Sequence, residues 1–177
     1  QSGFEWRERK LNLYEQYIKN KFDLSAFGIE RGESRSDYFC TPKGAKIIGW
    51  TGVDGIHYCT IKALGEIVFA VEPMGDAGRH AFPVAENFAD FLRLLMACGH
   101  EAYIEQAHAW SREQYDNFVK ENPITTTANE QILYLQKEHG LAPIDDPYNY
   151  LKTIYDNFDF STVPYKKDYY EYVPKEA

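Results

Sequence analysis

The amino-acid sequence predicts an α+β fold in which an antiparallel sheet of about four to six strands is preceded by one helix and followed by several C-terminal helices. Three observations favour this class. The first 22 residues have a helical period, residues 38–71 contain short β-branched and aromatic runs separated by turn residues, and helical periods return after residue 86. A chain of 177 residues is long enough for one sizeable core, so residues 1–177 are expected to form a single domain.

The first predicted element is an amphipathic helix from Phe4 to Phe22, whose other face carries most of the charged residues. In residues 25–37 the apolar side chains have neither helical nor strand spacing, which predicts a loop. The three residues before the helix, 1–3, resemble the remnant of a cleaved purification tag. The apolar face of the helix consists of Phe4, Leu11, Tyr14, Ile18 and Phe22.

Four strands are predicted next, joined by glycine-containing and proline-containing turns into an antiparallel meander. The run Ile67–Val71 is apolar throughout, which indicates a central strand covered on both faces. Helices must therefore cover this sheet. The segment Ala81–Val84 leads into the next helix. The predicted strands are Tyr38–Thr41, Ala45–Trp50, His57–Ile61 and Ile67–Val71.

Helices fill most of the chain after residue 86, where apolar residues recur at spacings of three and four. Ser111, Thr127 and Asp146 are typical N-cap residues, and Gly99 and Gly140 are expected to end their helices. Residues 161–177 are rich in Tyr and Lys and have no assignable structure. The predicted helices begin near Glu86 and then run over Glu101–Trp110, Ser111–Glu121, Asn129–His139 and Pro147–Phe158.

The net charge of −8 lies almost entirely in the C-terminal part. Residues 1–70 carry 10 basic and 9 acidic side chains, whereas residues 71–177 carry 9 basic and 18 acidic ones. Such a field repels nucleic-acid phosphates and anionic lipids, so neither nucleic acid nor membrane is an expected partner. A basic protein is the favoured partner, because the same field speeds its encounter.

The three cysteines, Cys40, Cys59 and Cys98, have no CxxC spacing, which favours reduced thiols in the cytoplasm. No apolar run approaches the roughly 18 residues that span a bilayer. The sequence also contains no phosphate-binding glycine loop, no GxSxG elbow and no HExxH motif. We therefore expect a protein without cofactor, metal site or catalytic residues.

One alternative stays open, a ligand-binding or catalytic pocket near Trp50, His57 and Cys59. His57 and Cys59 project from the same face of a predicted strand, where a thiolate and its base would have to lie close together. Core packing explains the same pair equally well, because the surrounding run forms a half-buried strand in any case. No third residue that would orient the histidine is identifiable.

Tyrosines and acidic residues interleave in the C-terminal part, a composition that favours a protein-binding surface. Rings that cover a helix face, with their hydroxyl groups in water, are the structural alternative. The candidate partner-binding residues are Trp50, Asp54, Tyr148, Tyr155 and Asp156.

Three segments within residues 38–98 follow the order of a known family. Ile47–Tyr58 is similar to a glycine-aspartate turn between two strands, Glu66–Val71 to the next strand, and Val84–Leu92 to the helix after the final strand. In these segments the chain resembles the SUKH superfamily, which contains fungal regulators of cell-wall glucan synthesis and many bacterial immunity proteins. The leucine-proline start and asparagine-glycine-glycine motif of the family have no clear match, and the helical, tyrosine-rich extension over residues 99–177 exceeds its usual core. Asp54 matches the family's turn aspartate, for which shaping the turn is an adequate structural reason.

The resemblance implies a non-enzymatic module, with helices against a sheet, that binds another protein. In bacteria such modules are typically immunity proteins that block a cognate toxin, often a nuclease. An acidic surface suits that role physically, because nucleases present basic, phosphate-binding surfaces. The resemblance therefore implies an immunity-type protein with a basic toxin or nuclease domain as its partner.

Overall fold

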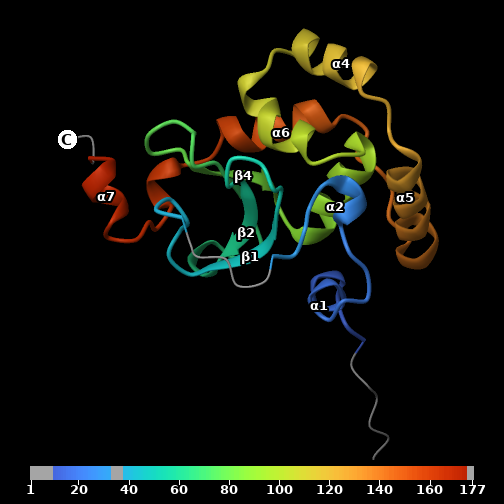
Figure 1. Ribbon diagram of the computed structural model, residues 1–177, viewed down its shortest axis with the longest axis horizontal. Coiled ribbons are helices and arrows are strands. Elements are labelled where there is room, and N and C mark those ends of the chain that lie inside the picture. Colours follow the sequence, from blue (N-terminus) through green and yellow to red (C-terminus); the bar gives the residue numbers. More distant parts are fainter. Residues whose placement is uncertain (1–9, 33–37, 175–177) are drawn as a thin grey trace, which may run out of the picture.

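The computed structural model describes residues 10–32 and 38–174. These residues form one four-stranded antiparallel sheet with one α-helix before it and six after it, which confirms the α+β prediction (Figure 1). The elements in chain order are α1 (Leu13–Ile18), β1 (Ala45–Trp50), β2 (His57–Ile61), β3 (Val68–Val71), β4 (Ala81–Ala85), α2 (Phe88–Cys98), α3 (Ala102–Gln106), α4 (Arg112–Glu121), α5 (Thr126–His139), α6 (Pro147–Asp156) and α7 (Tyr169–Tyr172).

The strands lie in the sheet in the order of the sequence, β1-β2-β3-β4, and each pairs antiparallel with the next. β3 lies between β2 and β4, and all four of its residues are buried. The prediction of a central strand covered on both faces is therefore confirmed.

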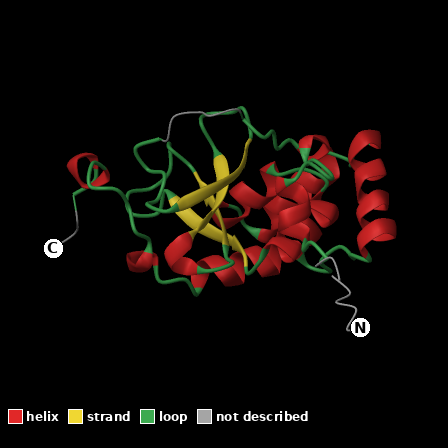
Figure 2. Cartoon of the chain, turned by 90° about the horizontal axis from the view of Figure 1, so that it is seen from below, coloured by secondary structure: helices red, strands yellow, loops and turns green. Residues whose placement is uncertain are grey.

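The two faces of the sheet are covered differently. Helices pack on one face, where Tyr58, Ala70 and Phe82 join the larger core. The other face carries Cys59 and Phe69, and the chain after α6 covers it with Val163, Tyr165 and Tyr169. Figure 2 shows the strands between the main group of helices and this C-terminal segment. Because side chains alternate along a strand, both cores draw on the same four strands.

The first helix is shorter than predicted, and a different residue forms its buried contact. α1 covers six residues from Leu13, and the side chain of its N-cap residue, Asn12, forms a capping box with Glu15. Tyr17 is fully buried, whereas Ile18 is 38% exposed, so the predicted apolar face is wrong at that position. Asn20 has a φ of 57°, a left-handed conformation that stops the helix before Phe22. Residues 4–9 of the predicted helix, and the supposed tag remnant at residues 1–3, lie outside the described residues.

One prediction near the sheet is wrong, and one strand was not predicted. The segment Tyr38–Thr41 is a turn and not a strand, because the Tyr38 backbone amide donates to Thr41 Oγ1 and the Thr41 amide donates to the Tyr38 carbonyl. The segment Ala81–Val84 leads into a helix as expected, but it does so as strand β4, which the sequence did not predict. Pro83 weakens the strand signal there, but an edge strand tolerates proline because one of its sides needs no ladder hydrogen bond.

Most of the later helices begin and end where their capping residues predict. Ser111 and Asp146 are N-caps, and Gly99 and Gly140 end their helices in the left-handed conformation. α5 begins three residues earlier than predicted, because Thr125 and not Thr127 caps it. The predicted helix Glu101–Trp110 divides into α3 and the 3-10 turn Ala107–Ala109.

Tyrosine hydroxyl groups meet backbone groups at both edges of the sheet. At the β4 edge, Tyr165 Oη accepts from the Ala81 amide at 2.9 Å, and Tyr150 Oη accepts from the Glu86 amide at 2.9 Å. At the β1 edge, Tyr17 Oη donates to the Ile48 carbonyl at 2.6 Å. Tertiary contacts thus satisfy backbone groups that no neighbouring strand reaches.

We expect Tyr165→Phe to lower the free energy of unfolding by about 1–3 kcal/mol, because the buried Ala81 amide loses its acceptor. Urea unfolding measures the change. Tyr172→Phe is the matched control, since Tyr172 is 73% exposed and its substitution should change stability by less than about 0.5 kcal/mol. Equal stabilities of the two variants would contradict the assigned role of Tyr165.

Candidate interaction surface

Two loops leave the same end of the sheet. In the register of the strands, Trp50 pairs with His57, His57 with Val71, and Val71 with Ala81. The β1–β2 turn, residues 51–56, and the β3–β4 loop, residues 72–80, therefore emerge side by side.

Two further segments pack at this end. The Phe39 ring lies 5.3 Å from the ring of His80 and 5.8 Å from that of Tyr172, measured between centroids. Tyr169 Oη accepts from the Gly78 amide at 2.9 Å and forms a hydrogen bond of 2.8 Å with His80 Nδ1. The turn at residues 38–41 and the segment 166–172, which contains α7, are thereby fixed beside the two loops.

Exposed apolar side chains concentrate in these four segments, 38–41, 51–56, 72–80 and 166–172. Nine large hydrophobic side chains are exposed among the described residues, and five of them lie here. We call this region the loop-end surface. Apolar side chains gathered at one place on a surface are typical of protein-binding sites. Its exposed apolar members are Tyr38, Phe39, Val53, Met74 and Tyr172.

Acidic side chains outnumber basic ones in the loop-end surface. The basic side chains are Arg79, Lys166 and Lys167. Burial raises the pKa of Glu72, and the nearby carboxylates of Asp76 and Asp54 raise it further. The surface thus combines exposed apolar area with an excess of negative charge. Its acidic side chains are Asp54, Glu72, Asp76, Asp168 and Glu171.

Two buried carboxyl groups belong to α3 and the residue before it: Glu101 immediately precedes the helix, and Glu105 is its penultimate residue. Glu101 and Glu105 are 5% and 6% exposed. Burial raises the pKa of Glu101 to about 7, and burial together with Glu101 and Glu72 raises that of Glu105 to about 8. No pattern in the sequence predicts burial of this pair, because glutamates one helical turn apart ordinarily lie on a solvated face.

Of the five candidate partner-binding residues, the loop end of the sheet contains Trp50 and Asp54. Trp50 is only 3% exposed, and its ring lies 4.4 Å from that of His57, so it packs beneath the surface. Asp54 is exposed at the tip of the β1–β2 turn with a φ of 49°, a conformation that aspartate tolerates better than most residues. Asp54 alone of these two can touch a partner directly.

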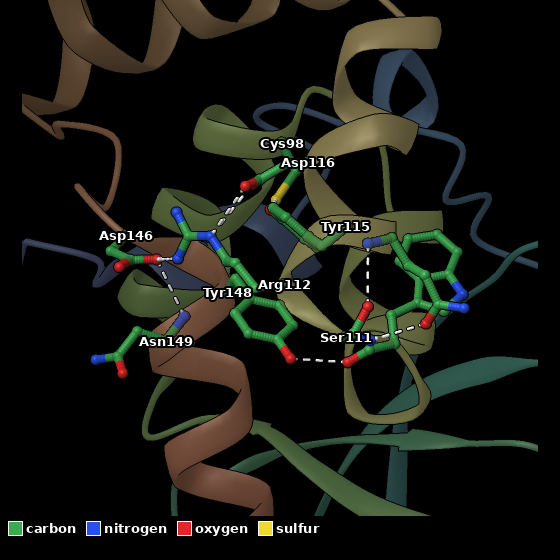
Figure 3. Close-up of polar contacts among 10 residues, drawn as sticks. Cys98, Ser111, Arg112, Tyr115, Asp116, Asp146, Tyr148 and Asn149 are labelled. Atoms are coloured by element: carbon green, nitrogen blue, oxygen red, sulfur yellow. Dashed lines mark hydrogen bonds and ion pairs between the residues drawn. The ribbon is translucent and has the colours of Figure 1, made fainter.

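Tyr148 joins α6 to α4, as Figure 3 shows. Its hydroxyl donates to the Trp110 carbonyl at 2.7 Å. The Arg112 guanidinium lies over the Tyr148 ring and pairs with Asp116 at 3.2 Å and with Asp146, the N-cap of α6, at 2.9 Å. These contacts lie within the helical part of the chain and explain Tyr148 without a partner.

Tyr155 and Asp156 lie at the C-terminal end of α6. Tyr155 is 8% exposed and stacks on His108 with ring centroids 4.7 Å apart. Asp156 is exposed and forms a 3.8 Å ion pair with Lys152. The structure therefore does not bring the five candidate residues into one site. The residues missed by the sequence are the exposed apolar ones of the loop-end surface. All of them except Tyr172 of α7 lie in turns and loops, where neither helical nor strand periodicity gives a signal.

The proposed pocket around Trp50, His57 and Cys59 is filled by the protein itself. His57 and Cys59 are fully buried. The two ring nitrogens of His57 contact the Gly55 carbonyl at 2.8 Å and Thr41 Oγ1 at 3.2 Å. Burial raises the pKa of the Cys59 thiol, so the thiol stays protonated at neutral pH and is a poor nucleophile.

A groove of about 610 Å³ lies elsewhere, along α6. Its walls come mainly from α6 and from the segment before that helix, together with Ile67, Glu86 and Arg93. This volume is in the range of small-molecule sites. None of Trp50, His57 and Cys59 lines it.

No protein family model, curated protein or solved structure matches the chain. Within the described ranges, no group of three or more His, Cys, Asp or Glu side chains is arranged to hold a metal ion. In the same part of the chain, every helix is too short or too polar to cross a membrane.

We expect the three thiols of the folded protein to resist a charged disulfide reagent at pH 7.5. Burial raises the pKa of Cys40 to about 11 and that of Cys98 to about 12, and Cys59 is also shielded. Absorbance of the released thiol should show negligible reaction until urea unfolds the chain, after which all three react. Rapid modification of Cys59 in the folded protein, identified by peptide mass, would revive the catalytic alternative.

Proposed function

We propose that this protein is a non-enzymatic binding module that uses the loop-end surface to bind a basic protein. The observation that carries the proposal is the concentration of exposed apolar side chains in four segments that meet at one end of the sheet. Apolar area supplies affinity at an interface, whereas charge mainly sets partner choice and association rate. The acidic excess of the same segments favours a basic partner.

The resemblance of residues 38–98 to the SUKH superfamily supports a more specific role. We propose an immunity-type function, in which the bound protein is a toxin such as a nuclease. A nuclease needs a cationic surface to hold phosphates, and an acidic surface can occupy it as a phosphate mimic. In this role the acidic side chains contribute to binding of the toxin as well as to solubility.

Affinity capture from a lysate of the source organism, at low and at moderate salt, tests the proposal. We expect one basic protein whose retention weakens with salt. The double variant Met74→Ala with Tyr172→Ala should weaken binding of that protein roughly tenfold or more, because it removes exposed apolar area from the surface. Leu133→Ala is the matched control, since Leu133 is 60% exposed on α5.

The charge contribution has its own matched pair of variants. Asp76→Asn with Glu171→Gln removes two acidic charges from the loop-end surface, and Glu130→Gln with Glu138→Gln removes two from α5. Only the first pair should slow association and reduce its salt dependence. Equal effects of both pairs would assign the binding to net charge and would contradict a localised surface.

The immunity role also requires that the captured protein be toxic to cells. Its production alone should stop cell growth, and co-production of this protein should restore growth. A captured protein that leaves growth unaffected would retain the binding function and refute the immunity role.

A further inference from the structure

Glu101 and Glu105 are buried together between α3 and the sheet. Glu101 immediately precedes α3, and Glu105 lies one helical turn later, so their side chains share one face. Each is less than one-tenth exposed. Glutamates are almost never buried to this extent unless a cation or a proton neutralises them.

Within residues 10–32 and 38–174, the groups that act on the pair are acidic or neutral, and they come from four parts of the chain. On β2, the fully buried Tyr58 donates its hydroxyl proton to Glu101 Oε2 at 2.8 Å and to the Glu101 carbonyl oxygen at 3.1 Å. Besides burial, the carboxylates of Glu101, of Glu72 in the β3–β4 loop and of Asp54 in the β1–β2 turn all raise the pKa of Glu105, whereas the Gln106 side chain lowers it. Cys98 of α2 lies near Tyr58 and is protonated at neutral pH.

This arrangement suits neutral carboxyl groups better than charged ones. Desolvation and three neighbouring carboxylates both oppose ionisation of Glu105. We propose that Glu101 and Glu105 form a proton-linked pair that holds α3 against the sheet while it is protonated and loosens this contact when both groups ionise.

The direction of the pKa shifts supports the proposal. The folded-state pKa values of about 7 and about 8 lie above the ordinary value of 4.5, so between these limits the folded chain binds more protons than the unfolded chain. Stability from this pair is therefore fully present below pH 4.5, falls as the pH rises, and is lost above pH 8. The window includes neutral pH, at which the pair is partly ionised.

The consequence extends to the adjoining loops, because Glu72 and Asp54 belong to the loop-end surface. Ionisation of the pair adds negative charge behind that surface and releases a helix beside it. The inference concerns the isolated chain and does not depend on the proposed binding function, so either can fail without the other.

Carboxyl ¹³C NMR of the isolated protein tests the pair directly. We expect two glutamate signals with titration midpoints near 7 and 8 in the wild type. Each single variant, Glu101→Gln or Glu105→Gln, should leave one glutamate signal with a raised titration midpoint. Glu101→Gln should also lower the midpoint of Glu105, because it removes a neighbouring negative charge. Tyr58→Phe should raise the midpoint of Glu101, because the lost hydrogen bond favours its ionised form.

The pH dependence of unfolding gives a second measurement. The urea midpoint of the wild type should decrease between pH 5 and pH 8.5, and the double variant Glu101→Gln with Glu105→Gln should lose much of this slope. Glu130→Gln with Glu138→Gln, which changes two exposed glutamates of α5, should retain it. Midpoints of both carboxyls below pH 6, or an unchanged slope in the first double variant, would overturn the proposal.

Discussion

Hydrogen bonds from tyrosine hydroxyl groups hold together parts of this chain that are far apart in the sequence. A tyrosine ring can be buried at little cost only when its hydroxyl finds a partner. Here the partners are mostly backbone groups of other elements, so each ring contributes apolar area and also fixes the position of a distant segment. The tyrosines that do so are Tyr17, Tyr58, Tyr103, Tyr148, Tyr150, Tyr165 and Tyr169.

The same contacts decide which surface remains for a partner. The C-terminal segment covers the second face of the sheet through Tyr165 and Tyr169, and α6 lies beside β4 through Tyr150. The loop end retains apolar side chains, such as Met74 at 80% exposed, that no other part of the described chain covers. The candidate interaction surface is therefore defined by where the covering segments end.

Local signals predicted much of the fold. Strands β1 to β3 follow from short apolar runs between turns, and Ser111, Asp146 and Gly99 mark helix ends because capping depends on residues within one turn. β4 was missed because Pro83 weakens a strand signal that only an edge position permits. α1 ended early because Asn20 adopts a backbone conformation that no periodic pattern reveals.

The candidate site was harder to predict, for a physical reason. Tyrosine is common both at interfaces and in cores that offer a hydrogen-bond partner, and the sequence does not distinguish Tyr148, tied to Trp110, from the exposed Tyr172. Burial of Glu101 and Glu105 depends on β2 and on two loops, which are distant in the sequence. Of the predicted residues, Asp54 fits both its turn and an exposed position at the candidate surface.

The outer edge of β4 offers few free backbone donors. Pro83 has no amide hydrogen, and the amides of Ala81 and of Glu86, just after the strand, donate to the hydroxyl groups of Tyr165 and Tyr150. A strand from a second molecule would have to displace these side chains before it could extend the sheet, so this edge resists the strand-to-strand aggregation to which open sheets are prone.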